Sequence, residues 1–515
     1  MEQKPIGWIH DFSLAQPNIK DNTADVDRLF DMIKKSYGIQ SLTTDLPLIK
    51  KIPTILRQSF YHVTCAVFEY DSQGILLDVW DSKAHQPVLG VAIDLGTTSV
   101  TVRIIHLNNG LHCAQKSFTN PQVSYGADIL SRIHYSNQPE GLTQLSQCII
   151  QSINDAIQIL CSENQLDVSS IYLFSLAGNT AMTHLLLGLN PQWIIREPYI
   201  PVMNKPGLMR ANDIGFISNP SAHILIFPNI GSYFGGDLIA GILYSGMYHA
   251  EQPCILVDVG TNAEVVIGNQ EWLLACAGAA GPALESGVTD IGMPAGPGAI
   301  DSMTYNIQTD SISYHTIDNL NPIGICGSGM IDLAAVLFQS GRIDIRGKFV
   351  PSKCGNLLNS LNGMPVYQVV PANQSGTTVA LTISQADIDS LIRSKAAMYT
   401  ILTTITEAIG LSVNDLPIFY IAGTFGTYIN PKSAITIGMI PDLDISRFKT
   451  LGNSSLEGAT LALVSPHDVR DILAIRDKIT YLELNVNQTF MNRFSAAKFL
   501  PHTDKTLFPS VISNQ

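Results

Sequence analysis

Apolar runs that end in glycine turns recur along the chain. The run LGVAIDLGTTSVTVRIIHL at 89–107 predicts a buried strand, a sharp turn after Asp94 and a second strand. The run ILVDVGTNAEVVI at 255–267 repeats this pattern after Asp258, again as Asp-x-Gly-Thr. Because each turn follows a strongly apolar strand, the chain is predicted to contain an internal duplication.

Helical and strand-like periodicities follow each turn. After the first turn, helical spacing covers 126–136, 142–163 and 178–189, and strand-like runs cover 170–178 and 222–229. After the second turn, strands at 254–268 precede helices at 326–340 and 384–410 and a buried strand at 416–423. We therefore predict two α/β halves, over 89–252 and 253–515.

Residues 1–88 follow a different pattern. An extended lead-in over 1–20 precedes a predicted helix over 21–38, which has an acidic first turn, basic residues near its end and Gly38 as its stop. The stretch 60–81 alternates like two strands joined at DSQG. We predict a small α+β domain ahead of the two halves.

Length and composition set limits on the function. A chain of 515 residues is too long for one compact core, and 46% hydrophobic with 14% charged residues suits a globular protein with a large buried parallel sheet. The net charge of −13 excludes nucleic acid as a partner, because phosphate binding needs a basic face. The start lacks the apolar stretch of a signal peptide, and no run of about 18 apolar residues occurs. We expect a cytoplasmic protein with no membrane partner.

The eight cysteines are scattered, and no pair is closer than Cys148 and Cys161. Zinc pairs and iron–sulfur ligand sets need closer spacings, so we expect free buried thiols and no iron–sulfur cluster. Cys326, at a predicted helix start, and His184, in an apolar helix, are interpreted as packing residues.

An aspartate at a strand end beside a glycine turn suits phosphate and metal chemistry. Glycine lets backbone approach a ligand, successive N–H groups form an anion cradle, and the carboxylate can hold Mg²⁺ through water. Asp94 and Asp258 are therefore candidate magnesium ligands and catalytic residues. The candidate phosphate-binding residues are Gly96, Thr97, Thr98, Gly260, Thr261 and Asn262. For either turn taken alone, an ordinary hairpin is the alternative.

Two further acids are candidates for orienting the attacking water in phosphoryl transfer, Glu264 and Asp237. A surface or capping role is the alternative for each. Asp237 lies in a stretch of small residues at 235–243, and 455–463 is similar. Such stretches permit close helix crossing at a hinge, or tight core packing alone.

Three glycine-rich segments are further candidates. The strand–turn–helix pattern at 421–435 suits a nucleotide sugar or base, with Gly423, Thr424 and Gly426 as ligands, or is a plain loop. The predicted helix start at 324–332 offers Gly327, Ser328 and Gly329 to a phosphate or ribose. The loop 279–301 is either a flexible lid or an ordered structural loop.

Five of these segments, taken in order, resemble the phosphate-1, connect-1, phosphate-2, adenosine and connect-2 motifs of the actin-like ATPases. They are the turn after Asp94, 235–243, the turn after Asp258, 421–435 and 455–463. Within that superfamily, longer motifs over nearly the whole chain resemble the reductive activators of corrinoid proteins: DNTADVDRL, NPQVSYGADILSRI, AGNTAMTHLLLGL, GPALESG, GAID, GICGSGMIDL, AGTFGTYINP and FLPH. The resemblance implies a two-lobed, duplicated RNase H-like fold with MgATP in the interlobe cleft. It also implies ATP hydrolysis coupled to returning a Co(II) corrinoid (cobalamin-type) protein to Co(I) in methyl-transfer metabolism.

The sequence departs from that family in one respect. The family's N-terminal [2Fe–2S] domain is not found, and the sequence begins at what resembles the middle domain. A separate ferredoxin-like donor is therefore expected. Two alternatives stay open: a redox-independent ATPase that binds or remodels a corrinoid or methyltransferase partner, and a small-molecule kinase. A homodimer is an open alternative to a monomer.

Overall fold

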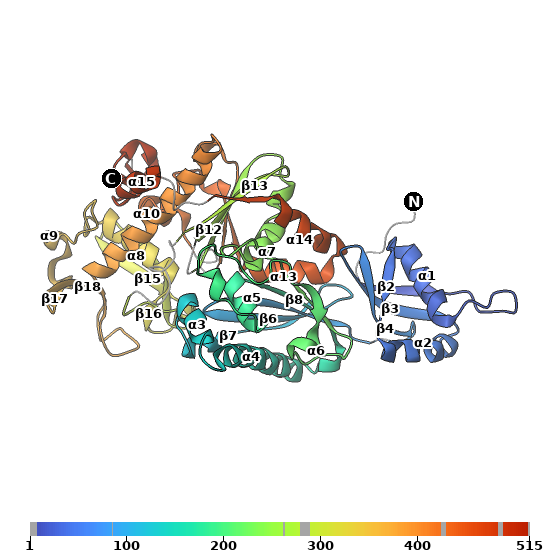
Figure 1. The fold of residues 1–515 in the computed structure, drawn as a ribbon. Coiled ribbons are helices and arrows are strands. Elements are labelled where there is room, and N and C mark those ends of the chain that lie inside the picture. Colours follow the sequence, from blue (N-terminus) through green and yellow to red (C-terminus); the bar gives the residue numbers. More distant parts are fainter. Residues whose placement is uncertain are drawn as a thin grey trace. The chain divides into compact units, whose positions relative to one another are not determined.

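The structure, a computed structural model, describes residues 8–84, 86–260, 263–278, 289–423, 429–482 and 488–512 (Figure 1). The chain forms two compact units. The first contains Met1–Tyr244 and Ser455–Asp477, and the second contains Ser245–Ser454 and Lys478–Gln515. Two helices late in the sequence therefore pack with the first unit, α13 (Ser454–Val464) and α14 (Pro466–Lys478).

The first unit begins with a small α+β domain, drawn in blue in Figure 1. Its sheet has the order β1-β3-β4-β2 and is packed by two helices. The bounds are β1 (Ile9–Ser13), α1 (Asp25–Tyr37), β2 (Ser41–Thr43), α2 (Leu46–Gln58), β3 (His62–Tyr70) and β4 (Gln73–Asp81). The predicted helix and strand pair are confirmed, and α1 ends at Gly38, which has a φ of 68°. The sequence prediction missed α2, and it missed β1 inside the lead-in.

A mixed sheet forms the centre of the first unit, in the order β7-β6-β5-β8-β10-β9. The parallel sheet expected from the composition is wrong, because the short turns after the first and second strands allow only antiparallel pairing. β5, β6 and β7 are antiparallel, whereas β8 is parallel to β5 and β10 is parallel to β8. The bounds are β5 (Leu89–Leu95), β6 (Ser99–His106), β7 (His112–Thr119), β8 (Ile171–Gly178), β9 (Gly207–Arg210) and β10 (His223–Ile226). The apolar runs of the sequence are thus the buried strands.

Helices cover this sheet with apolar faces. They are α3 (Ile129–Ser136), α4 (Gly141–Glu163), α5 (Thr180–Leu186) and α6 (Ala211–Ile214). The next helix, α7, spans Gly236–Ser245. Helix α7 meets α13 at backbone distance, because a Cβ at Gly458 would lie 2.1 Å from the carbonyl oxygen of Ala240. The two small-residue stretches therefore pack closely against each other, and a hinge at this crossing stays a prediction.

The second unit repeats the strand order of the first. Its main sheet is ordered β21-β20-β11-β12-β13-β22, with β11, β12 and β13 antiparallel and β20 parallel to β11. The bounds are β11 (Cys254–Val259), β12 (Ala263–Gly268), β13 (Leu273–Gly278), β20 (Phe419–Ala422), β21 (Phe448–Gly452) and β22 (Ile479–Tyr481). In both sheets the first strand lies between the second and the fourth, and a further parallel strand pairs with the fourth on its other side, β10 in the first sheet and β21 in the second. The predicted duplication and the actin-like α/β fold class are confirmed.

The rest of the second unit adds helices and two small sheets, β15-β14-β16 and β17-β18-β19. The helices are α8 (Gly327–Gln339), α9 (Pro351–Cys354), α10 (Gln385–Ala408), α12 (Pro431–Thr436), α15 (Gln488–Ala497) and α16 (Pro509–Ile512). The strands are β14 (Ala299–Asn306), β15 (Ser311–Thr316), β16 (Gly324–Ile325), β17 (Leu358–Leu361), β18 (Met364–Val370) and β19 (Leu381–Ser384). Among the described residues, no helix combines the length and apolar character needed to cross a membrane.

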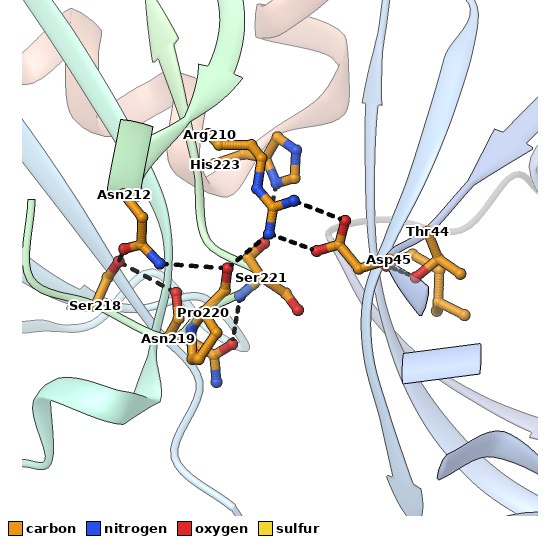
Figure 2. Close-up of polar contacts among 10 residues, drawn as sticks. Thr44, Asp45, Arg210, Asn212, Ser218, Asn219, Pro220, Ser221 and His223 are labelled. Atoms are coloured by element: carbon orange, nitrogen blue, oxygen red, sulfur yellow. Dashed lines mark hydrogen bonds and ion pairs between the residues drawn. The ribbon is translucent and has the colours of Figure 1, made fainter. Parts of the chain in front are cut away.

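Polar contacts tie the small domain to the rest of the first unit. Arg210, at the end of β9, donates two hydrogen bonds to the carboxylate of Asp45, at 3.1 and 3.0 Å (Figure 2). Tyr172 donates its hydroxyl to Asp78 at 2.6 Å, and the indole N–H of Trp8 donates to the carbonyl of Leu463 at 2.6 Å. The small domain thus contacts both the first α/β sheet and α13.

Candidate functional site

The turn after Asp94 in the first unit is fixed by two asparagines. Asn120 donates from its side chain to the carbonyl of Gly96 at 2.8 Å and from its backbone to the carbonyl of Thr98 at 2.8 Å. Asn179 donates to the hydroxyl of Thr97 at 3.0 Å. A Cβ at Gly96 would lie 2.6 Å from the carbonyl oxygen of Ser99, so the turn is too tight for a side chain there. The predicted residues Gly96, Thr97 and Thr98 therefore form one rigid turn.

Sequence reasoning did not single out these asparagines. Asn120 is fully buried, and Asn179 is the N-cap of α5, where its side chain accepts from the backbone N–H of Met182 at 2.9 Å. A signal for Asn179 was present, because an apolar strand followed by Gly-Asn-Thr is typical of a strand that leads into a capped helix. Nothing in the local pattern marks Asn120 as a partner of Gly96.

Two acids come together beside this turn. Asp94 accepts a hydrogen bond from the hydroxyl of Ser455 at 2.8 Å. Burial, and then the negative charge of Asp94, raises the pKa of Asp237 to about 6. A Cβ at Gly235 would lie 2.5 Å from Asp237 Oδ1 and 2.3 Å from the Cα of Asn179. Asp94, Asp237 and Asn179 therefore converge on one place.

This set of oxygens fits a divalent cation. Asp94 and Asp237 are both only partly exposed. Close carboxylates that share a partly buried place repel one another, which is why one of them takes up a proton more readily. A hard cation such as Mg²⁺ prefers oxygen ligands and would relieve that repulsion. The neighbouring turn, with its glycine and threonines, is suited to the phosphates that such a cation accompanies.

The second unit also brings two acidic side chains together where its first strand ends. Asp258 of β11 is directly opposite Glu264 of β12 and pairs on its other side with Ala422 of β20. Gly423, which follows β20, has a φ of +87°, and a Cβ there would lie 2.6 Å from Asp258 Oδ1. Asp258, Glu264 and Gly423 are thus brought together at one end of the sheet, next to Gly260. The other predicted ligands of this unit, Thr261, Asn262, Thr424 and Gly426, lie outside the described residues.

Gly327, Ser328 and Gly329 begin α8, as predicted, but their contacts go to β14. Ser328 donates to the carbonyl of Asp301 at 2.9 Å, and a Cβ at Gly329 would lie 2.3 Å from the carbonyl oxygen of Ile300. Close helix–strand packing accounts for these small residues. A contact with phosphate or ribose stays a prediction.

The residues interpreted as packing groups behave as such. His184 is buried, its Nδ1 lies 2.7 Å from the carbonyl of Thr180, and its Nε2 accepts from the backbone N–H of Val202 at 3.1 Å. Cys326 is buried and its thiol donates to the carbonyl of Ile300 at 3.4 Å. All eight cysteines are free thiols, and six of them are buried as expected, whereas Cys113 and Cys148 are partly exposed. Residues 279–288 of the loop predicted as a lid or an ordered segment lie outside the described residues.

Comparison with known proteins gives matches along the whole chain. Three family models match in succession: the RACo linker region at 1–86, the RACo middle region at 89–250, and the C-terminal domain of RACo, the ASKHA domain, at 252–512. Among solved structures, a reductive activator for corrinoid,iron-sulfur protein superposes with a TM-score of 0.89 at 37% identity, covering 99% of this chain and 82% of that chain.

Two curated relatives are similar over most of their length. The corrinoid activation enzyme RamQ of Eubacterium limosum is 28% identical over 512 residues, which is 93% of this chain and 85% of the relative. The [Co(II) methylated amine-specific corrinoid protein] reductase of Methanosarcina barkeri is 22% identical over 440 residues, 78% of this chain and 75% of the relative. With its linker, middle and ASKHA regions in that order, the chain belongs to the RACo family.

Proposed function

We propose that this chain is an ATP-dependent reductive activator of a corrinoid protein. It would couple ATP binding and hydrolysis to the return of an inactive Co(II) corrinoid to Co(I), with electrons from a separate donor. The observation that carries the nucleotide part is the convergence of Asp94 and Asp237 beside the Gly96 turn. The names of the relatives, a corrinoid activation enzyme and a corrinoid protein reductase, support the corrinoid part.

In this proposal the first turn binds phosphate. Its backbone N–H groups and the hydroxyls of Thr97 and Thr98 donate to phosphate oxygens, and Asn120 and Asn179 keep the turn in shape beforehand. Mg²⁺, when bound, supplies charge neutralisation for the phosphates. Asp94 would hold the metal, and Ser455 orients the Asp94 carboxylate for this role.

Asp237 is the candidate for positioning the attacking water. Because its pKa is raised to about 6, its carboxylate is ionised at neutral pH yet still basic enough to accept a hydrogen bond strongly. Hydrolysis of ATP needs an oriented water and charge neutralisation more than a covalent group. Glu264 has the same candidate role beside Asp258 in the second unit.

The coupling to the corrinoid partner needs two conformations. A nucleotide can shift the equilibrium between the two conformations only if it binds one of them more tightly than the other. The partner protein must also bind the two conformations with different affinity. The eight cysteines of the chain are too dispersed for a [2Fe–2S] ligand set, so the electron is proposed to come from a separate ferredoxin-like protein.

The nucleotide site is tested with Asp94→Asn and Asp258→Asn. Each carboxylate is proposed to hold magnesium and its waters, so each variant should hydrolyse MgATP at least about a hundredfold more slowly while keeping its circular dichroism spectrum. Asp155→Asn, on an exposed face of α4, is a matched control that should keep the parent rate. Parent rates in both site variants would rule out the assignment.

A further inference from the structure

Arg132 is a buried cation with an incomplete set of partners. It lies in α3 and is fully buried. Its Nε donates to the carbonyl of Gly126 at 2.9 Å, and its Nη1 lies 3.2 Å from the sulfur of Met182. Its Nη2 has no hydrogen-bond partner among the described residues. Burial lowers the pKa of Arg132 to about 10, so the guanidinium is still charged at neutral pH.

Other buried cations of the chain are better compensated. Arg28 pairs with Asp21 at 2.5 Å, and Arg342 pairs with Asp310 at 3.0 Å. Lys395 donates to two backbone carbonyls at 2.6 and 2.7 Å. Among the described residues, by contrast, no carboxylate lies within ion-pair distance of Arg132.

The acid that acts on the pKa of Arg132 does not neutralise it. Asp128 raises that pKa by its charge, but its side chain is exposed and accepts from the backbone N–H of Ser131 at 2.7 Å, as the N-cap of α3. A buried charge without a counter-ion destabilises a fold unless another interaction offsets the cost. The counter-charge for Arg132 is therefore to be sought outside the protein.

The position of Arg132 indicates where that charge would be. The sulfur of Met182, 3.2 Å from the guanidinium, is 3.8 Å from the side-chain nitrogen of Asn120. That same nitrogen donates to the carbonyl of Gly96 at 2.8 Å. Arg132 thus lies directly behind the Gly96–Thr98 turn, separated from it by two side chains.

We propose that Arg132 is a positioning residue for polyphosphate: its buried charge attracts the phosphates held at the turn without touching them. The inference rests on the proposed nucleotide site. A charge acts more strongly through a protein interior than through water, because the interior screens it less. A bound polyphosphate supplies the missing counter-charge. The buried charge of Arg132 is less unfavourable when the anion is bound, and this difference in free energy strengthens binding of the anion.

The test compares Arg132→Met and Arg132→Lys with the parent protein by calorimetry. The ligands are a non-hydrolysable ATP analogue with Mg²⁺, and adenosine, which has no phosphate. Arg132→Met should bind the analogue about tenfold more weakly and adenosine unchanged within about twofold, because only the phosphates feel the charge. Arg132→Lys keeps its charge only while the buried amine holds its proton, because burial lowers the pKa of a lysine far more readily than that of an arginine. It should bind the analogue within about threefold of the parent at about pH 6 and more weakly at about pH 8, with adenosine binding unchanged at both.

The melting temperature without ligand gives a second readout. Arg132→Met removes an uncompensated buried charge and should melt at the parent temperature or above it. Equal weakening of the analogue and adenosine in both variants, or a marked loss of melting temperature in Arg132→Met, would show that Arg132 only braces the fold and would overturn the inference. If the parent protein itself fails to bind the analogue, the proposed nucleotide site is wrong instead.

Discussion

Ser455 donates its hydroxyl hydrogen to Asp94 Oδ1 at 2.8 Å, across 361 positions of sequence. The bond joins the first turn of α13 to the end of β5 within the first unit. It fixes one oxygen of the carboxylate that is proposed to hold magnesium, so α13 takes part in the site as well as in packing.

The first prediction concerns Ser455→Ala. Removal of the hydroxyl takes away the hydrogen bond that orients Oδ1 of Asp94, so the rate of MgATP hydrolysis should fall about tenfold with little change in melting temperature. Ser454→Ala is the matched control one residue earlier, because the Ser454 hydroxyl is buried without a hydrogen-bond partner among the described residues. The control should hydrolyse ATP at the parent rate. Equal rates in the two variants would remove Ser455 from the site.

The second prediction concerns the pH dependence given by Asp237. Its folded-state pKa is about 6, above the unfolded value of 3.8, so the folded protein binds more protons between these values. The stability contribution of this group is therefore complete below about pH 4 and is lost as the pH rises through about 6. Denaturant titrations of the parent and of Asp237→Asn should show the parent losing stability relative to the variant over that range.

Hydrolysis should change with pH in the opposite direction. If ionised Asp237 orients the water, the turnover number should rise as the pH passes through about 6. In Asp237→Asn the rate should be at least about a hundredfold lower and should lack that rise. A variant that keeps the parent's pH profile would show that another group is titrating.

The third prediction compares two glycines with similar backbone. Gly423 has a φ of 87° and Gly410 a φ of 73°, but a Cβ at Gly423 would meet Asp258 Oδ1, whereas a Cβ at Gly410 would meet nothing within 4 Å. Both alanine variants should lose about 1 kcal/mol of unfolding free energy from the left-handed conformation. Gly423→Ala should lose more than Gly410→Ala, because its Cβ would also lie 2.6 Å from the carbonyl oxygen of Val259. Only Gly423→Ala should also displace Asp258 and slow hydrolysis by at least about tenfold. Full activity in Gly423→Ala would mean that Asp258 is not needed in its present position.

The sequence predicts the repeated elements well, because each depends on a local apolar pattern. Asp94 and Asp258 each lie one residue before the end of a buried strand, β5 or β11, and each of these strands is the first of its sheet. Helix α2 is different. Its buried residues Leu48, Ile52 and Leu56 have helical spacing, but Pro53 within the helix reads locally as a break, and packing against the sheet outweighs that preference.

The candidate site is less predictable than the strands, because its residues come from segments that are far apart in the sequence. Asp94 and Gly96 are conspicuous in one short stretch, whereas Asn120 and Ser455 reach the same turn from distant segments that only folding brings together. Glycines also give an ambiguous signal. Gly423 makes room beside an aspartate and Gly329 makes room for a strand, and both look alike in the sequence.

The proposed ATP-dependent activation is tested most directly by measuring the oxidation state of the corrinoid cobalt. A candidate corrinoid partner protein, held as Co(II), is mixed with the chain and a low-potential reductant, and the absorption of Co(I) is recorded with MgATP and without it. If the chain is an ATP-dependent activator, Co(I) forms with MgATP. It does not form without ATP, or with the Asp94→Asn variant in place of the parent protein. Formation of Co(I) at the same rate in the absence of ATP would contradict the account.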